Sequence, residues 1–370
     1  MGVGTGSLEG LGLNSFGDVY RGKRVLLTGH TGFKGSWLAL WLRRLGAKVA
    51  GLALPPVGAD AHIAQIGGGF EELLADIRDR NVVREWVDCV RPEVVFHLAA
   101  QPLVRRSYRD PVETWGTNVL GTAHLLDACR GIDSVRAIVV VTTDKCYENR
   151  EWPWGYREND ALGGSDPYSA SKAACELLIS SWRRSFGGEG SRPLLASARA
   201  GNVIGGGDWS EDRLVPDLAR SMRSGRPLEI RSPKATRPWQ HVLESLSGYL
   251  LLGSKLLQGD LGCADSWNFG PGTDGNRTVE DVLAMLRMTW PEISWAVTPC
   301  TGPKEASLLQ LDCAKARMQL GWIPVWSLPE GLAATSEWYR TYLGTGRATS
   351  FEQLERYVRQ AAERGVAWAR

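Results

Sequence analysis

A glycine-rich turn between a short apolar run and a helical segment constrains the fold of this chain more than any other feature. The run 24–28 (RVLLT) has the form of a strand that is buried on both faces. It is followed by the turn 29–35 (GHTGFKG) and then by an apolar helical segment that ends near Gly46. Glycines let the backbone approach a ligand closely, and a helix N-terminus presents free N–H groups to an anion. The turn therefore predicts a dinucleotide-binding βα unit, in preference to a purely structural turn.

The alternation of short apolar runs and helical segments continues to about residue 205. Further strands are predicted over 48–54, 94–98 and 137–142, with weaker candidates over 194–198 and 267–269, and helices over 81–89, 111–130 and 168–186. Strands that alternate with helices form βαβ units, whose right-handed crossovers build a doubly wound sheet. The predicted fold class is therefore α/β: a doubly wound parallel Rossmann sheet with a smaller mixed C-terminal domain for the substrate.

The chain becomes irregular and richer in Pro, Arg and Trp after about residue 205, which suggests a domain boundary. We predict an irregular, loose leader over 1–22 and a dinucleotide-binding domain over 23–205, to which a further strand near 265–270 is added. The segments 206–264 and 271–370 are assigned mainly to the substrate-binding domain.

The composition argues against several other classes of protein. A formal net charge of +2 gives no overall field for nucleic acid or an anionic membrane. The chain contains no apolar run of the ~18 residues that a membrane span needs. Its 7 cysteines are scattered without a CxxC pair, which indicates reduced thiols. We therefore predict a cytoplasmic protein with no metal site, no nucleic-acid partner and no membrane partner.

A second motif places Tyr168 and Lys172 one helical turn apart, on the same face of a predicted helix. A phenol with a pKa of ~10 is a poor base at neutral pH, but a neighbouring ammonium stabilises the phenolate and lowers that pKa. The tyrosine can then take a proton from an alcohol while hydride leaves the carbon. Downstream of the glycine turn, this spacing favours catalysis over a solvated helix face.

A third group, Thr143, Asp144 and Lys145, follows the strand predicted over 137–142. It therefore lies at the carboxyl end of that strand, where α/β proteins bind their ligands. Thr143 can hydrogen-bond the reacting alcohol, and Asp144 and Lys145 form an acid/base pair beside it. Simple alcohol oxidation does not need this pair, so the loop predicts an additional proton transfer. A surface salt bridge is the less favoured interpretation.

One residue that dinucleotide-binding folds usually carry is missing. Such folds place an acid at the end of the second strand to hold the adenosine ribose. The segment 51–56 (GLALPP) contains neither that acid nor an Arg in its place, so the residues alone leave NAD and NADP open. Asp76 and Ile77, after a third predicted strand, could reach the adenine edge, although Asp76 could equally be a helix cap or turn residue.

Together these motifs resemble the extended short-chain dehydrogenase/reductase family, in its nucleotide-sugar branch. Within that branch the chain is most similar to the CDP-glucose 4,6-dehydratases, through stretches that cover most of residues 24–330. They include 28–42 (TGHTGFKGSWLALWL), 97–108 (HLAAQPLVRRSY), 142–160 (TTDKCYENREWPWGYREND), 199–209 (RAGNVIGGGDW) and 237–250 (RPWQHVLESLSGYL). Lys145 carries particular weight, because the thymidine-nucleotide relatives normally have Glu at that position.

The resemblance implies NAD as the cofactor and CDP-glucose as the substrate, which would become CDP-4-keto-6-deoxy-glucose plus water by internal hydride transfer. It implies a lyase of deoxysugar biosynthesis, of the kind that supplies lipopolysaccharide O-antigen. By analogy, Tyr168 takes the proton of the carbon-4 hydroxyl, and Asp144 protonates the departing carbon-6 hydroxyl. Lys145 acts in the carbon-5 proton transfer or stabilises the enolate. Thr143 and Lys172 complete the catalytic group.

The resemblance also assigns contacts to ligands. The cofactor is expected to contact Gly29, His30, Gly32, Phe33, Lys34, Gly35, Asp76, Ile77, Ala99, Ala100, Gln101, Thr117, Tyr168 and Lys172. The substrate is expected to contact Gln101, Thr143, Asn202, Arg213 and Arg237. The two arginines suit diphosphate oxygens because a guanidinium pairs with them bidentately, with surface salt bridging as the alternative.

Two further features of the resemblance concern the nucleotide and the assembly. The segment 304–309 (KEASLL) departs from the family pattern HEAHYL, so the base preference stays open. The helices predicted over 111–130 and 168–186 imply a homodimer, although a buried helix pair within one subunit explains their apolar pattern equally well.

Other functions remain open alongside the dehydratase. A nucleotide-sugar 4-epimerase, or a dehydratase for another nucleotide, would share the fold and the Tyr168–Lys172 motif. An epimerase, however, needs neither Asp144 nor Lys145. A non-catalytic NAD(P)-sensing protein on the same fold would commonly lack Tyr168 or Lys172.

Overall fold

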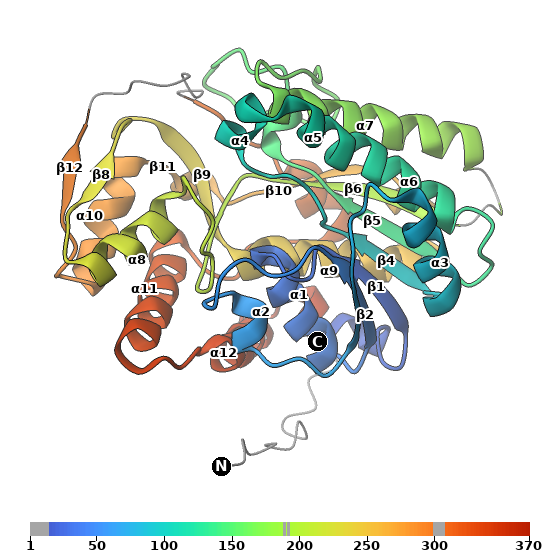
Figure 1. Ribbon diagram of the computed structural model, residues 1–370, viewed down its shortest axis with the longest axis horizontal. Coiled ribbons are helices and arrows are strands. Elements are labelled where there is room, and N and C mark those ends of the chain that lie inside the picture. The colour runs from blue at the N-terminus through green and yellow to red at the C-terminus, as the bar shows by residue number, and fades with distance from the viewer. Residues whose placement is uncertain (1–14, 188–189, 191–192, 299–307) are drawn as a thin grey trace.

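The structure is a computed structural model that describes residues 15–187, 190, 193–298 and 308–370. Its centre is a seven-stranded sheet in the order β3-β2-β1-β4-β5-β6-β10, with every neighbouring pair parallel. The strands are β1 (Arg24–Thr28), β2 (Lys48–Ala53), β3 (Glu71–Leu74), β4 (Val94–His97), β5 (Ala137–Val141), β6 (Leu194–Ala200) and β10 (Ser266–Phe269). The predicted doubly wound parallel fold is confirmed (Figure 1).

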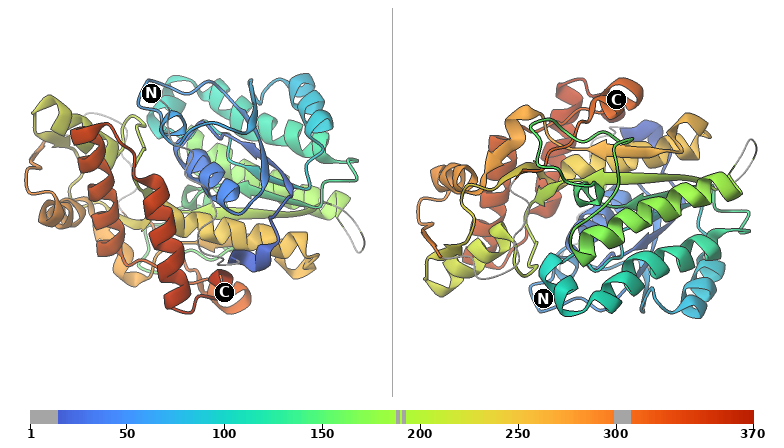
Figure 2. Two further views of the ribbon diagram at one scale, coloured as in Figure 1. Left: turned by 90° about the horizontal axis from the view of Figure 1, so that it is seen from below. Right: turned by 90° about the horizontal axis from the view of Figure 1, so that it is seen from above.

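Helices cover both faces of the sheet (Figures 1 and 2). On one face lie α1 (Phe33–Arg44) and α9 (Val242–Leu257), and on the other lie α3 (Arg80–Val90), α6 (Gly121–Cys129) and α7 (Pro167–Phe186). Side chains of β1 alternate between the two layers: Val25 and Leu27 pack into one hydrophobic cluster and Leu26 into the other. This is why the strand reads as a continuous apolar run.

The helix predicted over 111–130 is divided into three parts. It consists of α5 (Pro111–Trp115), a π-helical turn (Gly116–Leu120) and α6. A Cβ at Gly121 would lie 2.7 Å from Cγ2 of Ile77, so the helix approaches the segment after β3 closely at this glycine. A periodic apolar pattern does not distinguish a π turn from the α-helix around it, so the interruption was not predicted.

Part of the leader that was predicted to be loose is anchored: Phe16 and Tyr20, within residues 15–22, are buried in the core. Phe16 stacks on Trp368 with ring centroids 5.0 Å apart, and Tyr20 donates a hydrogen bond of 2.5 Å to Leu250 O in α9. These contacts join the start of the described chain to its last turn and to α9, which packs on one face of the central sheet. Residues 1–14, the rest of the predicted leader, lie outside the described residues.

A smaller unit covers the carboxyl edge of the sheet. It contains a three-stranded sheet of β7 (Asn202–Ile204), β9 (Thr236–His241) and β11 (Asn276–Thr278), and a parallel pair of β8 (Leu228–Ile230) and β12 (Trp295–Val297). Around these lie α8 (Leu214–Ser224), α10 (Val279–Thr289) and α11 (Leu328–Thr345). Although α9 falls in a segment assigned mainly to the substrate-binding domain, it packs on β5 and β6 of the large sheet. The other domain boundaries stay predictions.

A buried carboxylate ties the C-terminal layer to the centre of the molecule. Glu244, in the first turn of α9, accepts hydrogen bonds from the backbone N–H groups of Val325 (2.9 Å) and Trp326 (2.7 Å). It also accepts one of 2.8 Å from the hydroxyl of Tyr357, which lies in α12 (Ser350–Glu363). Burial raises the pKa of Glu244 to about 7.

Two features are absent from the described residues. Over these ranges, no helix is long and apolar enough to cross a membrane. The same residues contain no group of three or more His, Cys, Asp or Glu side chains placed to hold a metal ion.

Candidate active site

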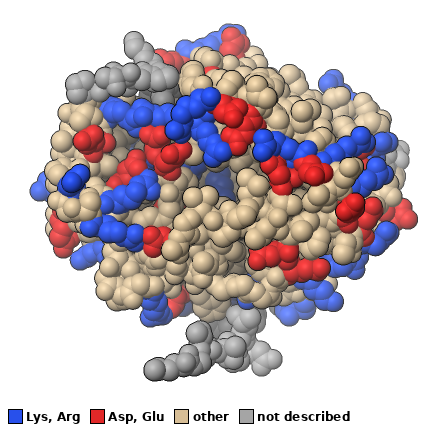
Figure 3. Space-filling model, in the orientation of Figure 1, with Lys and Arg blue, Asp and Glu red and all other residues tan. Residues whose placement is uncertain are grey.

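A cavity of about 530 Å³ lies at the carboxyl ends of the central strands. One wall is formed by the glycine turn after β1 and by the segments after β2, β3 and β4. The facing wall is formed by the segment 208–217, by β8 and its following residues, and by β9. In Figure 3 it is the hollow in the middle of the molecule, with Lys, Arg, Asp and Glu side chains gathered at its rim. The parallel sheet brings these loops together because all its strands end at the same edge.

The glycine turn is held by backbone contacts that exclude a side chain. Gly29 has φ +75°, and a Cβ there would lie 2.7 Å from the backbone N of Ala99 in the next loop. A Cβ at Gly35 would collide with the carbonyl oxygen of Gly29. The helix α1 begins at Phe33, and no side chain at the preceding Gly32 caps its N–H groups. The turn is thus a cradle with free N–H donors, which fits the pyrophosphate of a dinucleotide.

The side chain of His30 lies away from this cradle, contrary to its predicted contact with the cofactor. It is buried below β2, where a Cβ at Gly51 would lie 2.5 Å from His30 Nδ1, and its Nε2 lies 2.7 Å from Glu72 Oε2 in β3. Burial lowers the pKa of this imidazole below its usual value, against the opposing effect of Glu72. The position of a residue within a turn does not determine which way its side chain points.

The other predicted cofactor contacts divide into those that line the cavity and one that does not. The lining residues are Gly29, Gly32, Phe33, Lys34, Gly35, Asp76, Ile77, Ala99, Ala100, Thr117, Tyr168 and Lys172. Gln101 is buried outside the lining, where its Nε2 donates to Thr114 Oγ1 at 2.8 Å and to Leu103 O at 3.2 Å. It therefore shapes the loop after β4, and its predicted contacts with cofactor and substrate do not agree with this placement.

Asp76 forms a local turn and also lines the cavity, and its contact with the adenine edge stays a prediction. Its carboxylate lines the cavity, and it also accepts hydrogen bonds from the backbone N (2.9 Å) and the Nη2 (2.6 Å) of Arg78. The bond to the guanidinium is the main reason why the pKa of Asp76 lies below its usual value.

Tyr168 and Lys172 both face the cavity from the first turns of α7. The helix begins with Pro167, and the side chain of the preceding Asp166 caps it by accepting from Ser169 N at 2.9 Å. Burial raises the pKa of the Tyr168 phenol, while its hydrogen bond with Thr143 acts in the opposite direction. Burial also lowers the pKa of Lys172. In the protein alone the phenol is therefore protonated, and taking up a substrate proton requires positive charge brought by a ligand.

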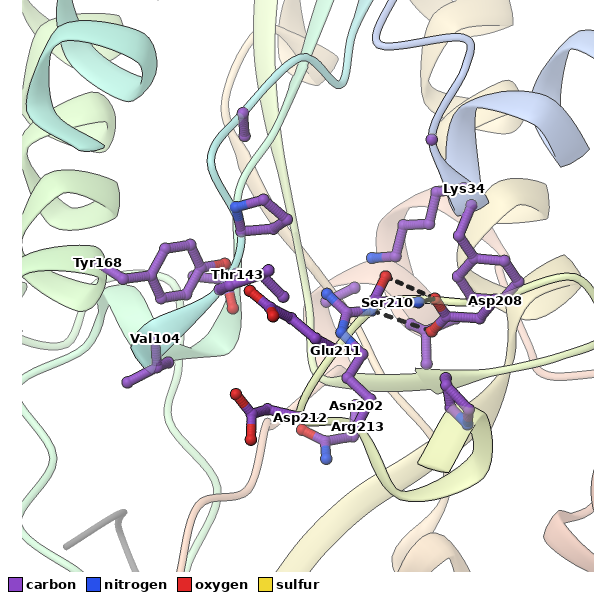
Figure 4. Close-up of a pocket in the computed structure, with 18 of the residues that line it drawn as sticks. Lys34, Val104, Thr143, Tyr168, Asn202, Asp208, Ser210, Glu211, Asp212 and Arg213 are labelled. Atoms are coloured by element: carbon purple, nitrogen blue, oxygen red, sulfur yellow. Dashed lines mark hydrogen bonds and ion pairs between the residues drawn. The ribbon is translucent and has the colours of Figure 1, made fainter. Parts of the chain in front are cut away.

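The loop after β5 places Thr143 beside this tyrosine (Figure 4). Thr143 Oγ1 donates to Asp144 Oδ1 at 2.9 Å, and Lys145 Nζ lies 3.7 Å from the same oxygen. Asp144 is fully buried, and its Oδ2 has no hydrogen-bond partner within the described part of the chain. Thr143 and Lys145 line the cavity, whereas Asp144 lies just behind them. Oδ2 is therefore the Asp144 oxygen that is free to carry a proton, and a protonated carboxyl group can donate that proton to a leaving group.

A buried ion pair that the sequence analysis did not identify supports this loop from behind. Glu176 of α7 accepts from Thr142 Oγ1 at 2.5 Å and from Arg199 Nη2 at 2.7 Å. Arg199 also donates to the hydroxyl of Tyr147 at 2.7 Å. Burial alone would raise the pKa of Glu176, but the charge of Arg199 holds it below its usual value. A charged residue in the otherwise apolar strand β6 was the available signal for this pair.

The side chain of Lys34 extends from the glycine turn into the cavity (Figure 4). Its Nζ donates to the hydroxyl of Tyr249 in α9 at 3.3 Å. Burial and the positive charge of Arg213 lower the pKa of Lys34 to about 7. This ammonium therefore loses its proton more easily than that of an ordinary lysine.

The facing wall carries the predicted substrate contacts Asn202, Arg213 and Arg237, and all three line the cavity. Arg213 Nη1 lies 3.3 Å from Asp208 Oδ2, and this carboxylate also accepts from the backbone N and the hydroxyl of Ser210. Residues 304–307 of the segment that departs from the family pattern lie outside the described residues.

The sequence comparisons agree with this geometry. The model of the "NAD dependent epimerase/dehydratase family" matches residues 25–262. The chain belongs to this family. It is 47% identical to the CDP-glucose 4,6-dehydratase of Salmonella typhimurium over 333 residues, which cover 88% of this chain and 93% of that protein. It is 27% identical to a dTDP-glucose 4,6-dehydratase of Xanthomonas campestris pv. campestris, over 85% of this chain and 93% of the relative. The predicted resemblance is confirmed.

Solved structures of the NAD dependent epimerase/dehydratase family have the same fold. A UDP-glucose 4-epimerase of Thermus thermophilus in complex with NAD has a TM-score of 0.75 and 28% identity, covering 86% of this chain and 99% of the other. The dTDP-glucose 4,6-dehydratase of Streptomyces venezuelae with NAD and TYD bound has a TM-score of 0.72 and 25% identity, covering 87% and 98%. NAD, the predicted cofactor, is the cofactor of this family.

The cavity fits such a cofactor on structural grounds. The glycine cradle and the uncapped N-terminus of α1 would hold the pyrophosphate, and Asp76 and Ile77 line the end of the cavity beyond β2 and β3. When bound, NAD would supply the acceptor and then the donor of a hydride. Tyr168 and Lys172 would position and deprotonate an alcohol beside it.

Proposed function

We propose that this protein is a CDP-glucose 4,6-dehydratase, a lyase that converts CDP-glucose to CDP-4-keto-6-deoxy-glucose and water. The observation that carries the proposal is that two functional groups lie next to each other at the cavity, with Asp144 just behind the lining residues. Thr143, Tyr168 and Lys172 suit alcohol oxidation, and Asp144 with Lys145 adds the proton transfers that loss of water requires. The relative at 47% identity supports both the reaction and the nucleotide.

Tyr168 takes the proton of the carbon-4 hydroxyl, which Thr143 holds by a hydrogen bond, and hydride leaves carbon 4. The resulting ketone acidifies the proton on carbon 5. Lys145, whose side chain is 26% exposed toward the cavity, accepts that proton or stabilises the enolate. Asp144 gives a proton from its unpartnered oxygen to the departing carbon-6 hydroxyl. Return of the hydride from bound NAD to carbon 6, and return of a proton to carbon 5 from the Lys145 side, would complete the reaction.

Mass spectrometry tests the reaction directly. The purified protein is incubated with NAD and, in parallel, with CDP-glucose, UDP-glucose and dTDP-glucose. We expect loss of one water from the CDP sugar alone. Loss of water from another sugar would keep the reaction and overturn the nucleotide assignment. An isomer of unchanged mass would instead identify a 4-epimerase.

We also propose that the protein is a homodimer formed through α5, the π-helical turn and α7. These neighbouring elements expose large apolar side chains: Val112 is 80% exposed, Leu120 58% and Leu177 60%. Light scattering after size exclusion should give twice the chain mass for the wild type. Leu177→Glu should give monomers, and Met288→Glu, at an even more exposed site on α10 (83%), should leave the mass unchanged. A monomeric wild type would contradict the proposal.

A cytoplasmic location and a role in supplying deoxysugars for lipopolysaccharide O-antigen stay predictions. Binding of an O-antigen-specific phage or serum to a deletion strain would test the role in O-antigen supply.

A further inference from the structure

Two arginines from opposite walls of the cavity share a single carboxylate oxygen. Arg105 belongs to α4 (Val104–Arg109), which follows β4, whereas Arg231 directly follows β8 of the smaller unit. Arg105 Nη1 and Arg231 Nη2 each lie 3.3 Å from Asp212 Oδ1. All three residues line the cavity, and Figure 4 shows Asp212 on the side facing Val104. This carboxylate therefore bridges the two walls.

Asp212 is held weakly compared with the other carboxylate of the same loop. Its side chain is 33% exposed, and its ion pairs in the described part of the chain are those with the two arginines. Asp208, the partner of Arg213, is only 3% exposed and is fixed by the backbone N and hydroxyl of Ser210. Asp212 thus has the features of an exchangeable counter-ion, and Asp208 those of a fixed one.

The geometry of the bridge also leaves bonding capacity unused. Both guanidinium groups reach the same oxygen at 3.3 Å, longer than the ~2.7–2.9 Å of a strong charge-assisted hydrogen bond, and the contact from Arg231 is also a hydrogen bond. Asp212 itself has φ +57°, a left-handed conformation that is unfavourable for a residue with a Cβ. A ligand with several anionic oxygens can satisfy both arginines better than this carboxylate does.

We propose that Arg105 and Arg231 form a binding site for the diphosphate of the nucleotide sugar, and that the diphosphate displaces the carboxylate of Asp212. The identity of the ligand rests on the proposed function. Before binding, Asp212 keeps the two positive charges neutralised and the guanidinium groups pointed into the cavity. After binding, the two arginines pair with phosphate oxygens from both walls. Arg105 and Arg231 thereby add to the contacts predicted for Arg213 and Arg237.

The test is the affinity of the full chain for CDP, measured by calorimetry, with KM and kcat for CDP-glucose alongside. We expect Arg105→Gln and Arg231→Gln each to weaken CDP binding about tenfold, the loss of one charge-assisted pair. Asp212→Asn should strengthen CDP binding about threefold or more, because it removes the competing anion. The same substitutions should affect CMP less, since CMP lacks the second phosphate, and kcat should change little.

A matched control is available on the same helix and the same loop. Arg109 Nη2 pairs with Glu211 Oε1 at 3.0 Å, but Arg109 does not line the cavity. Arg109→Gln should therefore leave CDP affinity unchanged, which separates the cavity arginines from a general loss of positive charge. Circular dichroism verifies that each variant is folded. We expect folding to be retained because the substituted side chains are partly exposed.

Two results would overturn the proposal. Wild-type affinity for CDP in both Arg105→Gln and Arg231→Gln would show that the arginines do not bind the diphosphate. Weaker binding in Asp212→Asn would show that the carboxylate positions the arginines and is not displaced. Failure of the proposed function is seen separately, as absence of water loss from CDP-glucose in the wild type. If UDP or dTDP binds in place of CDP, the same variants are compared with that diphosphate.

Discussion

The two walls of the cavity are built in different ways. The wall after β1 depends on backbone contact: a side chain at Gly29 or Gly35 would collide with neighbouring main-chain atoms. The facing wall depends on charged side chains, and the Arg105–Asp212–Arg231 bridge that joins it to the first wall is one-third exposed and consists of ion pairs with one hydrogen bond of 3.3 Å. The main chain of the first wall leaves no room for an added side chain, whereas the ion pairs of the facing wall can exchange partners while the main chain stays in place.

This difference matches what each ligand requires. A cofactor that is regenerated in every turnover can remain in a rigid cradle, and rigidity keeps its reactive end against Tyr168 and Lys172. A substrate must enter and its product must leave in every turnover, so a wall of replaceable ion pairs suits it. The predictions below test this contrast from the largest expected effect to the smallest.

Gly35→Ala should have the largest effect, because its Cβ would collide with Gly29 O and the main chain must shift to relieve the overlap. We expect a loss of ~1–3 kcal/mol in the free energy of unfolding and no detectable NAD binding. Thermal unfolding and calorimetry with NAD measure both. The control is Gly32→Ala in the same turn, where a Cβ would lie 3.4 Å from Gly29 O and stability should stay close to the wild type. A stable Gly35→Ala variant that binds NAD would contradict the rigid-cradle interpretation.

Tyr168→Phe and Lys145→Ala should separate the two proton-transfer steps. Without the phenol, turnover should fall by ~10²–10⁴-fold, and no reduced cofactor should form after mixing with CDP-glucose. Without Lys145, the cofactor should still be reduced transiently, but water loss should stall. Stopped-flow absorbance of reduced NAD and mass spectrometry of the product distinguish these outcomes. Normal turnover of Lys145→Ala would show that its assigned role is wrong.

Asp208→Asn and Asp212→Asn compare the fixed and the exchangeable carboxylate. Asp208 is buried and accepts hydrogen bonds of 3.0 and 2.6 Å from Ser210, so its loss should cost ~1–3 kcal/mol of the free energy of unfolding. Asp212→Asn should change this free energy by less than ~0.5 kcal/mol, as is usual for an exposed site. Chemical denaturation measures both variants. If both variants lose the same free energy of unfolding, Asp208 and Asp212 do not differ as a fixed and an exchangeable carboxylate.

Glu244→Gln tests whether the stability of the C-terminal layer, which Glu244 connects to α9, depends on pH. Burial raises the pKa of Glu244 to about 7, above the ~4.3 of an unfolded Glu, so the folded state holds this proton more tightly. The stability contributed by protonation is fully present below the unfolded pKa and is lost as pH rises through the folded value. Between about pH 6 and about pH 8.5 we expect the wild type to lose about 1 kcal/mol relative to Glu244→Gln.

Denaturant titrations at the two pH values measure this difference. Glu244→Gln has lost one hydrogen-bond acceptor at both pH values, so its free energy of unfolding should be lower than that of the wild type. The part of the pH dependence that Glu244 causes should be absent from this variant. If the wild type and Glu244→Gln differ by the same free energy of unfolding at both pH values, the pH dependence comes from other groups.

The amino-acid sequence by itself determined the features that depend on neighbouring residues. The strand–glycine turn–helix unit, the alternation that gives a parallel sheet, and the one-turn spacing of Tyr168 and Lys172 all follow from local backbone geometry. The loop 143–145 was located for the same reason, because it follows a buried strand and strand ends share one edge of the sheet. Local patterns of this kind survive folding because tertiary contacts reinforce them.

Only the tertiary structure decided which way individual side chains point and which distant residues meet. It turns His30 toward Glu72 and Gln101 toward Thr114, and it packs residues 15–22 against the end of the chain. It also brings Glu176 to Arg199 and closes the Arg105–Asp212–Arg231 bridge across 126 positions of sequence, from residue 105 to residue 231. The physical reason is that these contacts depend on how separate elements pack together, and no periodicity or short motif encodes that packing.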